Sequence, residues 1–195
     1  MTTPVELMAP IQLVLTDRPL ERVDADIAVA GFFTDERPLR GGAARADWRL
    51  CGGLSRRIES GDLSGKSGEA MLIGCGRALR APRLMLLGLG DRQVYDQLRV
   101  SDETREALAR CRQLNLQRVA LTPLGIASDD VPRHAPALVA GILDAWQSAD
   151  VPMSLEVCVP RSEMPGAFRA FENARDAAGA ETISVSLDDS SVEAR

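Results

Sequence analysis

Short runs of apolar residues alternate along this chain with longer segments in which apolar residues recur every three or four positions. The short runs predict β-strands, and the helical spacing predicts amphipathic helices between them. The segment Ile27–Phe33 (IAVAGFF) is apolar on both faces, which is typical of a central strand in a covered sheet. In chain order, we expect strands over Ile11–Leu15, Ile27–Phe33, Glu69–Ile73, Arg83–Leu87, Arg118–Leu121, Leu155–Val159 and Thr182–Leu187.

Four helical segments are expected between these strands. The first has Gly61 as its C′ residue. The pair Gly52-Gly53 favours a break within it, because each internal glycine costs a helix about 1 kcal/mol. Ser101 is a suitable N-cap for the second helix, with acidic residues in its first turn. The four segments run from about Ala43 to Ser60, from Ser101, from Pro132, and from Ser162 to about Ala178–Gly179.

Alternating strands and helices indicate an α/β protein. We expect a three-layer α/β/α arrangement around a mixed, mostly parallel sheet of six or seven strands. A length of 195 residues fits one domain, and no linker is long enough to divide it. The prediction is therefore a single domain over residues 1–187, followed by a polar tail (DDSSVEAR) over residues 188–195.

The charge pattern argues against nucleic-acid binding. The 23 basic and 28 acidic residues give a net charge of −5 and are interleaved. Nucleic-acid-binding domains instead carry a basic excess on one face. No apolar run approaches the ~18 residues of a membrane span, and the N-terminus (MTTPVELMAP) does not have the pattern of a signal peptide. We therefore expect a cytoplasmic protein that does not bind membranes.

The sequence contains few residues that could support metal-dependent or nucleophilic catalysis. The four cysteines are widely spaced without a CxxC pair, and His134 is the only histidine, so the usual zinc sites cannot be assembled. His134 lies near a helix start and has no sequence-adjacent partners for a catalytic triad. We expect no metal, no cofactor and no catalytic residues, and four reduced, mostly buried thiols, namely Cys51, Cys75, Cys111 and Cys158.

Two glycine-containing segments invite comparison with phosphate loops. Gly88-Leu89-Gly90 follows a strand, where backbone N–H groups can cradle an anion. A GxG without a third glycine is also an ordinary turn, and Asp91 would repel phosphate, so both interpretations stay open. Lys66 lies in the segment SGKSG, which lacks the G-x-x-x-x-G-K-[ST] spacing of a P-loop and precedes a strand, so that interpretation is rejected.

The order of motifs resembles the N-terminal domain of the leucyl aminopeptidase family. The resemblance rests on ADIAVAGFFTDERPLRG, DWRLCGGLSRRIESGDLSGKSGEAMLI and RLMLLGLGDR, and it extends over about residues 10–180. The family's ordered elements correspond here to Asp26–Val29, Arg40–Ala44, Gly65–Glu69 and Leu84–Gly90. That domain is similar to the macro (ADP-ribose-binding) fold, so the resemblance implies a macro-like fold.

The resemblance also implies what this chain does not do. In that family two metal ions are held by a separate C-terminal domain, whose signature N-T-D-A-E-G-R-L does not occur in this sequence. A two-metal site needs closely placed carboxylates, and the only lysine here is Lys66. The chain is expected to be a non-catalytic assembly or regulatory module. Because the family's enzymes form hexamers, self-association or a protein partner is expected.

The alternative function is that of a sensor for a nucleotide or another ADP-ribose-like anion. The resemblance puts Gly41 and Gly42 in a phosphate-proximal loop and Asp17 near the adenine-binding position of macro domains. Together with Gly88 and Gly90, these residues form the candidate ligand-binding mouth. The asparagine-containing segment of ADP-ribose-hydrolysing macro domains is replaced here by AVAG, so hydrolysis is not expected.

The two tryptophans are the largest apolar side chains in the sequence. Large aromatic side chains contribute most to cores and interfaces, so both residues are expected in one or the other. Trp146 ends the apolar stripe of its helix and is the candidate for a contact between subunits. Trp48 is expected to be a core or interface residue as well.

Overall fold

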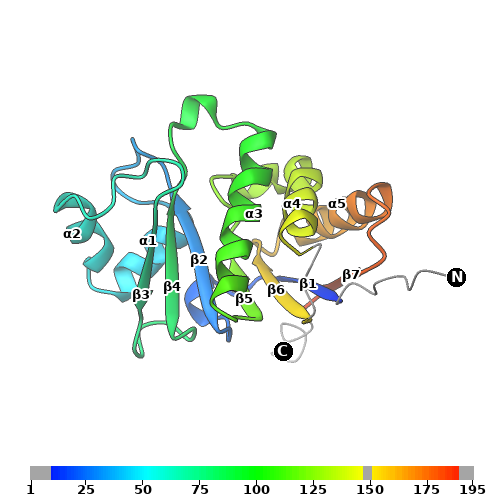
Figure 1. Cartoon of the computed structure of the whole chain (residues 1–195), viewed down its shortest axis with the longest axis horizontal. Coiled ribbons are helices and arrows are strands. Elements are labelled where there is room, and N and C mark those ends of the chain that lie inside the picture. Colours follow the sequence, from blue (N-terminus) through cyan, green and yellow to red (C-terminus); the bar gives the residue numbers. More distant parts are fainter. Residues whose placement is uncertain (1–9, 147–150, 189–195) are drawn as a thin grey trace, which may run out of the picture.

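The computed structural model describes residues 10–146 and 151–188 (Figure 1). The strands are β1 Ile11–Thr16, β2 Ile27–Phe32, β3 Ala70–Gly74, β4 Arg83–Gly88, β5 Arg118–Leu121, β6 Met153–Cys158 and β7 Ile183–Leu187. The helices are α1 Gly41–Arg49, α2 Gly53–Glu59, α3 Gln97–Gln113, α4 Val131–Trp146 and α5 Met164–Ala177. Three short 3₁₀ turns are η1 Leu20–Arg22, η2 Arg92–Val94 and η3 Ser128–Asp130.

The strands form one seven-stranded sheet in the order β3-β4-β2-β5-β6-β1-β7. Every neighbouring pair is parallel except β3 and β4, which are antiparallel. The prediction of a mostly parallel sheet of six or seven strands is thus confirmed. The strand IAVAGFF lies between β4 and β5, as its two apolar faces predict.

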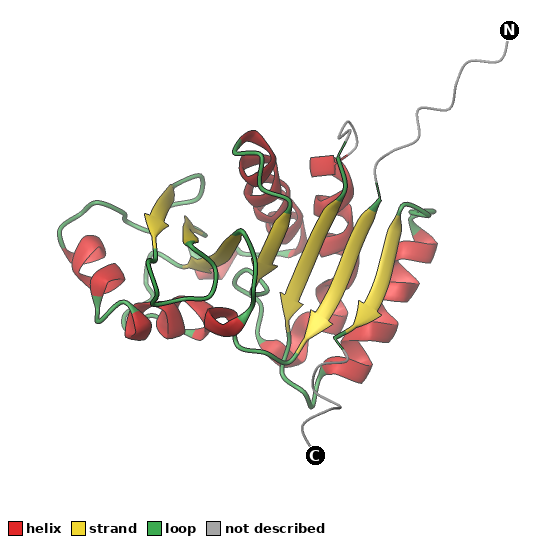
Figure 2. Ribbon diagram, turned by 90° about the horizontal axis from the view of Figure 1, so that it is seen from below, coloured by secondary structure: helices red, strands yellow, loops and turns green. Residues whose placement is uncertain are grey.

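Helices cover both faces of the sheet, which confirms the three-layer arrangement (Figure 2). Side chains alternate along β2, so Ile27 and Val29 join one core with α3, α4 and α5. Ala28, Ala30 and Phe32 join a second core with α1 and α2. The second helical layer does not extend over β1 and β7, where Gln12, Ser184 and Ser186 are exposed.

The predicted break in the first helix is confirmed. Cys51 and Gly52 adopt φ angles of 55° and 77° between α1 and α2. Two helix starts were predicted at the wrong residue. The N-cap of α3 is Asp96 and not Ser101, because the Asp96 side chain accepts a hydrogen bond from the Arg99 N–H at 3.0 Å.

The last helix, α5, begins at Met164 with Glu163 as its N-cap, two residues after the predicted start at Ser162. The polar tail expected over residues 188–195 lies, beyond Asp188, outside the described residues. In the described part of the chain, each helix is too short or too polar to cross a membrane.

The prediction of a subunit contact at Trp146 is wrong, whereas for Trp48 only the core alternative is excluded. Trp146 is completely buried, and its indole N–H donates to the carbonyl oxygen of Val151 at 3.0 Å, so it is a core residue and not a subunit contact. Trp48 is 76% exposed and lies outside the core, with the Arg49 guanidinium 5.9 Å from its ring centroid. The size and spacing of the two residues are visible in the sequence, but only packing decides which side of a helix is covered.

Candidate functional site at the carboxyl ends of the strands

Ligands of open α/β sheets bind at the carboxyl ends of the parallel strands. At this edge Asp17 directly follows β1. Gly88 is the last residue of β4, and Gly90 lies two residues beyond it. The strand order separates β1 from β4 by four steps, or about 19 Å at ~4.8 Å per step. Asp17 and the Gly88–Gly90 segment therefore cannot contact the same small anion.

The backbone N–H groups of Gly88-Leu89-Gly90 are all engaged within the protein. Gly88 donates to the Glu69 carbonyl at 2.9 Å, Leu89 to the Phe32 carbonyl at 2.9 Å, and Gly90 to the Gly65 carbonyl at 2.8 Å. A phosphate loop needs such N–H groups to point at its ligand. In this structure they tie β4 to β2 and to the loop that precedes β3.

The glycines at the end of β4 allow the loop before β3 to cross it closely. A Cβ atom on Gly88 would lie 2.2 Å from the Lys66 carbonyl oxygen and 2.6 Å from the Gly65 carbonyl carbon. Gly90 has a φ angle of 78°, which favours glycine. The turn interpretation, which the sequence left open, accounts for both glycines.

The SGKSGE segment wraps its N–H groups around an internal carboxylate. Glu69 accepts hydrogen bonds from the N–H groups of Ser64 at 2.8 Å, Gly65 at 2.9 Å and Lys66 at 3.2 Å, and from the Ser64 hydroxyl at 2.8 Å. Burial raises the pKa of Glu69, but these four hydrogen bonds outweigh it and leave the pKa lowered. These N–H groups are thus taken by a carboxylate of the same segment and do not face a ligand.

Gly41 and Gly42 begin α1 and differ from the β4 segment. The N-cap residue Arg40 is extended, with φ −126° and ψ 170°, and makes no side-chain hydrogen bond to the first turn. A Cβ atom on Gly42 would lie 2.5 Å from Cγ2 of Thr122, the residue that follows β5. The start of α1 therefore lies against the end of β5, with no side-chain cap on its N–H groups.

An ion pair and an aromatic pair fill the space beside the end of β2. The buried Glu36 carboxylate accepts from the Arg40 N–H at 2.9 Å and forms an ion pair with Arg92. The Arg92 guanidinium lies 4.2 Å from the centroid of the Phe33 ring, which meets Tyr95 edge-on at 4.9 Å. Nothing in the sequence pattern indicated this cluster, because its members come from two segments that are far apart in the chain, the loop after β2 and the η2 turn.

Asp17 lies beside a charged network at the end of β1. The next residue, Arg18, forms ion pairs with Glu156 at 3.1 Å and with Asp188 at 2.8 Å. Burial raises the pKa of Glu156, and the Arg18 charge offsets part of that rise. The network joins β1, β6 and the residue after β7, so the adenine-proximal position expected from the resemblance is next to a structural clamp.

The described residues contain no group of three His, Cys, Asp or Glu side chains that could hold a metal ion. His134 is partly buried in the first turn of α4. Of the cysteines, Cys75 and Cys111 are buried, Cys158 is half-buried, and Cys51 is exposed. Burial raises the pKa of Cys111 and of Cys158 to about 12, so both are poor nucleophiles.

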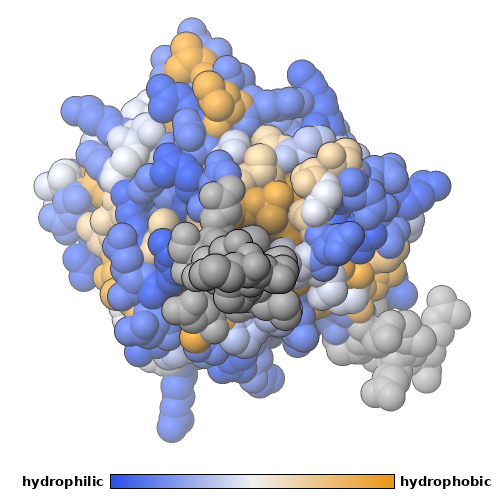
Figure 3. All heavy atoms as spheres, turned by 45° about the vertical axis from the view of Figure 1, so that its right-hand side comes forward, coloured by the Kyte–Doolittle hydropathy of each residue, from blue (hydrophilic) through white to orange (hydrophobic). Residues whose placement is uncertain are grey.

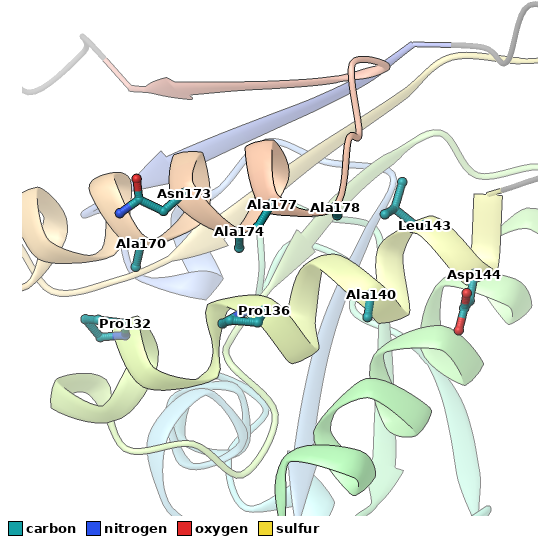
Figure 4. A pocket seen from close by; sticks show the side chains of 10 residues that line it. All are labelled: Pro132, Pro136, Ala140, Leu143, Asp144, Ala170, Asn173, Ala174, Ala177 and Ala178. Carbon is teal, nitrogen blue, oxygen red and sulfur yellow. The ribbon is translucent and has the colours of Figure 1, made fainter.

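A groove of about 610 Å³ lies between α4 and α5, away from the strand ends (Figure 4). Small side chains on both helices open it, and Asn173 and Asp144 are among its few polar members. On this side of the molecule the apolar surface forms small areas between hydrophilic ones (Figure 3). The lining residues are Pro132, Pro136, Ala140, Leu143, Asp144, Ala170, Asn173, Ala174, Ala177 and Ala178.

Residues 29–150 match the sequence profile of the cytosol aminopeptidase family, N-terminal domain. The chain belongs to this family. A probable cytosol aminopeptidase of Syntrophotalea carbinolica is 28% identical over 186 residues, which cover 85% of this chain and 36% of that protein. The chain thus spans about a third of the length of this relative, and the family's N-terminal domain is the part that is matched.

Solved structures confirm both halves of the resemblance. A tomato leucine aminopeptidase mutant superposes with a TM-score of 0.66 at 19% identity, covering 92% of this chain and 38% of that one. A Trypanosoma brucei macrodomain in complex with ADP-ribose superposes with a TM-score of 0.63 at 15% identity, covering 84% and 74% of the two chains. The fold is that of a macrodomain.

Proposed function

We propose that this chain is a non-catalytic assembly or regulatory domain that acts in the cytoplasm. The observation that carries the proposal is the family match, which lies within the family's N-terminal domain. The engaged N–H groups at the end of β4 and the filled space beside β2 support it, since both leave little room for chemistry at the strand ends.

The experiment is light scattering coupled to size-exclusion chromatography, with and without the Syntrophotalea carbinolica aminopeptidase. We expect the chain to self-associate, or to co-elute with that enzyme and change its rate of leucine-amide hydrolysis. The chain alone, with zinc or manganese added, is expected to show no hydrolysis. A monomer at micromolar concentration that ignores the enzyme would contradict an assembly role. Metal-dependent hydrolysis by the chain alone would contradict the non-catalytic role.

A second candidate function is the binding of an ADP-ribose-like anion. It is favoured by the uncapped start of α1 and by the similarity to a macrodomain in complex with ADP-ribose. The proposed ligand-binding mouth comprises Asp17, Gly41, Gly42, Gly88 and Gly90. Of these, Gly41 and Gly42 would donate N–H groups to phosphate. Gly88 and Gly90 donate within the protein and would contribute only through the position of their loop.

Thermal unfolding with ADP-ribose tests this candidate, since a ligand at 100 times its Kd stabilises a protein by about 2.7 kcal/mol. Arg40→Asp provides an internal carboxylate that caps the first turn of α1 and competes with the anion. Arg40→Ala is the matched control, because it removes the same side chain without adding a cap. We expect the ligand-induced shift to survive Arg40→Ala and to vanish in Arg40→Asp. No shift in the wild type removes the candidate.

A further inference from the structure

Strand β7 ends the sheet with backbone groups that have no neighbouring strand in the described chain (Figure 2). On its inner side, the Ile11 N–H donates to the Thr182 carbonyl at 2.9 Å, and the Asp188 N–H donates to the Leu15 carbonyl at 2.8 Å. Peptide groups alternate in direction along a strand, so the even-numbered residues of β7 face β1. The N–H and C=O groups of the odd-numbered residues therefore face the open edge.

The open edge of β7 is an unprotected one. Natural edge strands avoid pairing with other chains through charged side chains, proline or bulges. The β7 sequence, ISVSL, contains no charged residue and no proline. Its pairing with β1 continues without a bulge from Ile183 to Leu187. Leu187 is 42% exposed at the carboxyl end of the strand. Such an edge is suited to pairing with a further strand.

The sequence of β7 reads almost the same in both directions around Val185. In an antiparallel pair of two β7 strands centred on this residue, Val185 faces its own copy, Ile183 faces Leu187, and Ser184 faces Ser186. Val185 would exchange two hydrogen bonds across the axis. The Leu187 N–H of each copy would donate to the Ile183 carbonyl of the other copy, which adds two hydrogen bonds. The Ile183 N–H is already bonded to the Ala180 carbonyl at 3.0 Å and is not needed.

A recess beside β7 fits the same arrangement. It has a volume of about 400 Å³ and is lined by Arg175, Asp176, Gly179, Ala180, Glu181 and Ile183. Ile183, Val185 and Leu187 lie on one face of the strand, toward α5. Since Leu187 of a second copy would lie opposite Ile183, its exposed side chain would enter this recess.

The other edge of the sheet lacks these features. Strand β3 (AMLIG) also has no charged residue or proline. Pairing around its central residue, Leu72, would place Ala70 opposite Gly74, a pair with almost no side-chain contact. Cross-strand side-chain pairs stabilise strand pairing, so the ends of a β3 pair would contribute less than the Ile183–Leu187 pairs at the ends of a β7 pair.

We propose that two copies of this chain pair through β7, antiparallel about a two-fold axis at Val185, and join their sheets into one continuous sheet. The inference deepens the proposed assembly function and rests on its self-association part. We assign the edge to a second copy of the chain because two β7 strands match each other in three ways. Their backbone groups can form hydrogen bonds, Ile183 faces Leu187, and the recess beside β7 can accept the Leu187 side chain of the other copy.

Disulfide trapping tests the two-fold axis. In an antiparallel hydrogen-bonded pair the Cα atoms lie ~5.5 Å apart, within the range for a disulfide. In a Cys51→Ser background, which removes the exposed thiol, Val185→Cys is expected to form a covalent dimer under mild oxidation. Leu187→Cys is the matched control, because its two copies would lie about 14 Å apart. Cross-linking by both variants or by neither overturns the proposed register.

A matched pair of charge substitutions tests the edge itself. Leu187→Lys would bring an ammonium group to the partner recess, whereas Leu72→Lys places the same group on the β3 edge. Leu72 is 50% exposed, so both substitutions leave the core intact. We expect Leu187→Lys to weaken the dimer at least tenfold and Leu72→Lys to leave it unchanged, measured by sedimentation.

The outcomes separate the inference from the proposed function. A dimer that survives Leu187→Lys and yields no Val185→Cys cross-link overturns pairing through β7 but leaves the assembly function standing. A monomeric wild type that still binds the aminopeptidase likewise overturns pairing through β7 and leaves the assembly function standing. A monomeric wild type that binds nothing overturns both.

Discussion

The two glycine segments at the strand ends look alike in sequence and serve different purposes in the fold. The Gly88–Gly90 segment gives all three of its N–H groups to carbonyl oxygens of the same protein. Gly41 and Gly42 begin a helix that has no side-chain cap. Both segments permit close approach, but the first is crossed by backbone and the second lies against the side chain of Thr122.

A glycine after a strand indicates a ligand site only when the atoms that lie beside it are known. At Gly88 the neighbour is the carbonyl of Lys66, which cannot rotate away without moving the loop. At Gly42 the neighbour is the side chain of Thr122, which has other rotamers. The cost of adding one methyl group should therefore differ between the two positions.

Gly88→Ala should show the largest effect. Its new Cβ atom would lie 2.2 Å from a backbone oxygen, so the loop before β3 must shift. We expect a loss of about 3 kcal/mol, or a Tm lower by roughly 6–12 °C at this chain length. The control is Gly74→Ala, whose Cβ atom would meet nothing within 4 Å and which should leave Tm nearly unchanged. A wild-type Tm for Gly88→Ala would show that the close crossing is not required.

Glu69→Gln tests the internal carboxylate that organises the same loop. Loss of its charge should cost about 2 kcal/mol near neutral pH, because charge-assisted hydrogen bonds are the stronger ones. The folded-state pKa lies below the usual 4.5, so this stabilisation is present above that value and is lost as pH falls through the lowered pKa. Urea unfolding between about pH 3 and about pH 7 should show the difference between wild type and variant shrinking toward acid.

The control for this pH dependence is Glu103→Gln. Glu103 is buried and bonded to the Ser67 hydroxyl, and burial raises its pKa. Its contribution has the opposite sign: it is fully present below the unfolded-state pKa and is lost as pH rises through the raised value. Glu103→Gln should therefore gain stability relative to wild type as pH rises. Parallel pH profiles for the two variants would contradict both assignments.

Gly42→Ala should show the smallest effect, about 1 kcal/mol, because the Thr122 side chain can give way. The Cγ2 methyl and the Oγ1 oxygen of Thr122 would lie 2.5 Å and 2.7 Å from the new Cβ atom, and Thr122→Ala removes both. The double variant should thus recover most of the loss, as measured by a double-mutant cycle of urea unfolding energies. Additive losses would show that the strain lies elsewhere.

The strands were predictable because their apolar residues repeat with a clear period. Helix starts were less so, since Asp96 and Ser101 are both suitable N-caps. Val100 is completely buried, and it must lie inside the helix to reach the core, which extends α3 by one turn beyond the predicted start. That choice depends on what the helix packs against, and no local pattern contains it.

The candidate site was predictable only as a set of positions. Glycines after strands indicated where the backbone comes close to something, but not whether that partner is a ligand or another loop. The cluster of Phe33, Glu36 and Arg92 was not predictable at all, because it joins residues that are 56 positions apart in the chain. Asp17 was placed by family resemblance, and the strand order then separated it from Gly88.

By itself the sequence determined an α/β fold, a mostly parallel sheet of six or seven strands, a helix break at Gly52 and membership of the cytosol aminopeptidase family. It did so because hydrophobic periodicity and glycine backbone freedom are local properties. The tertiary structure decided that Trp146 is core, that Trp48 is exposed, that the N–H groups of Gly88–Gly90 are taken, and that β7 has an open edge. Those facts depend on strand order and on which segments cross in space, and neither is encoded in any one stretch of the chain.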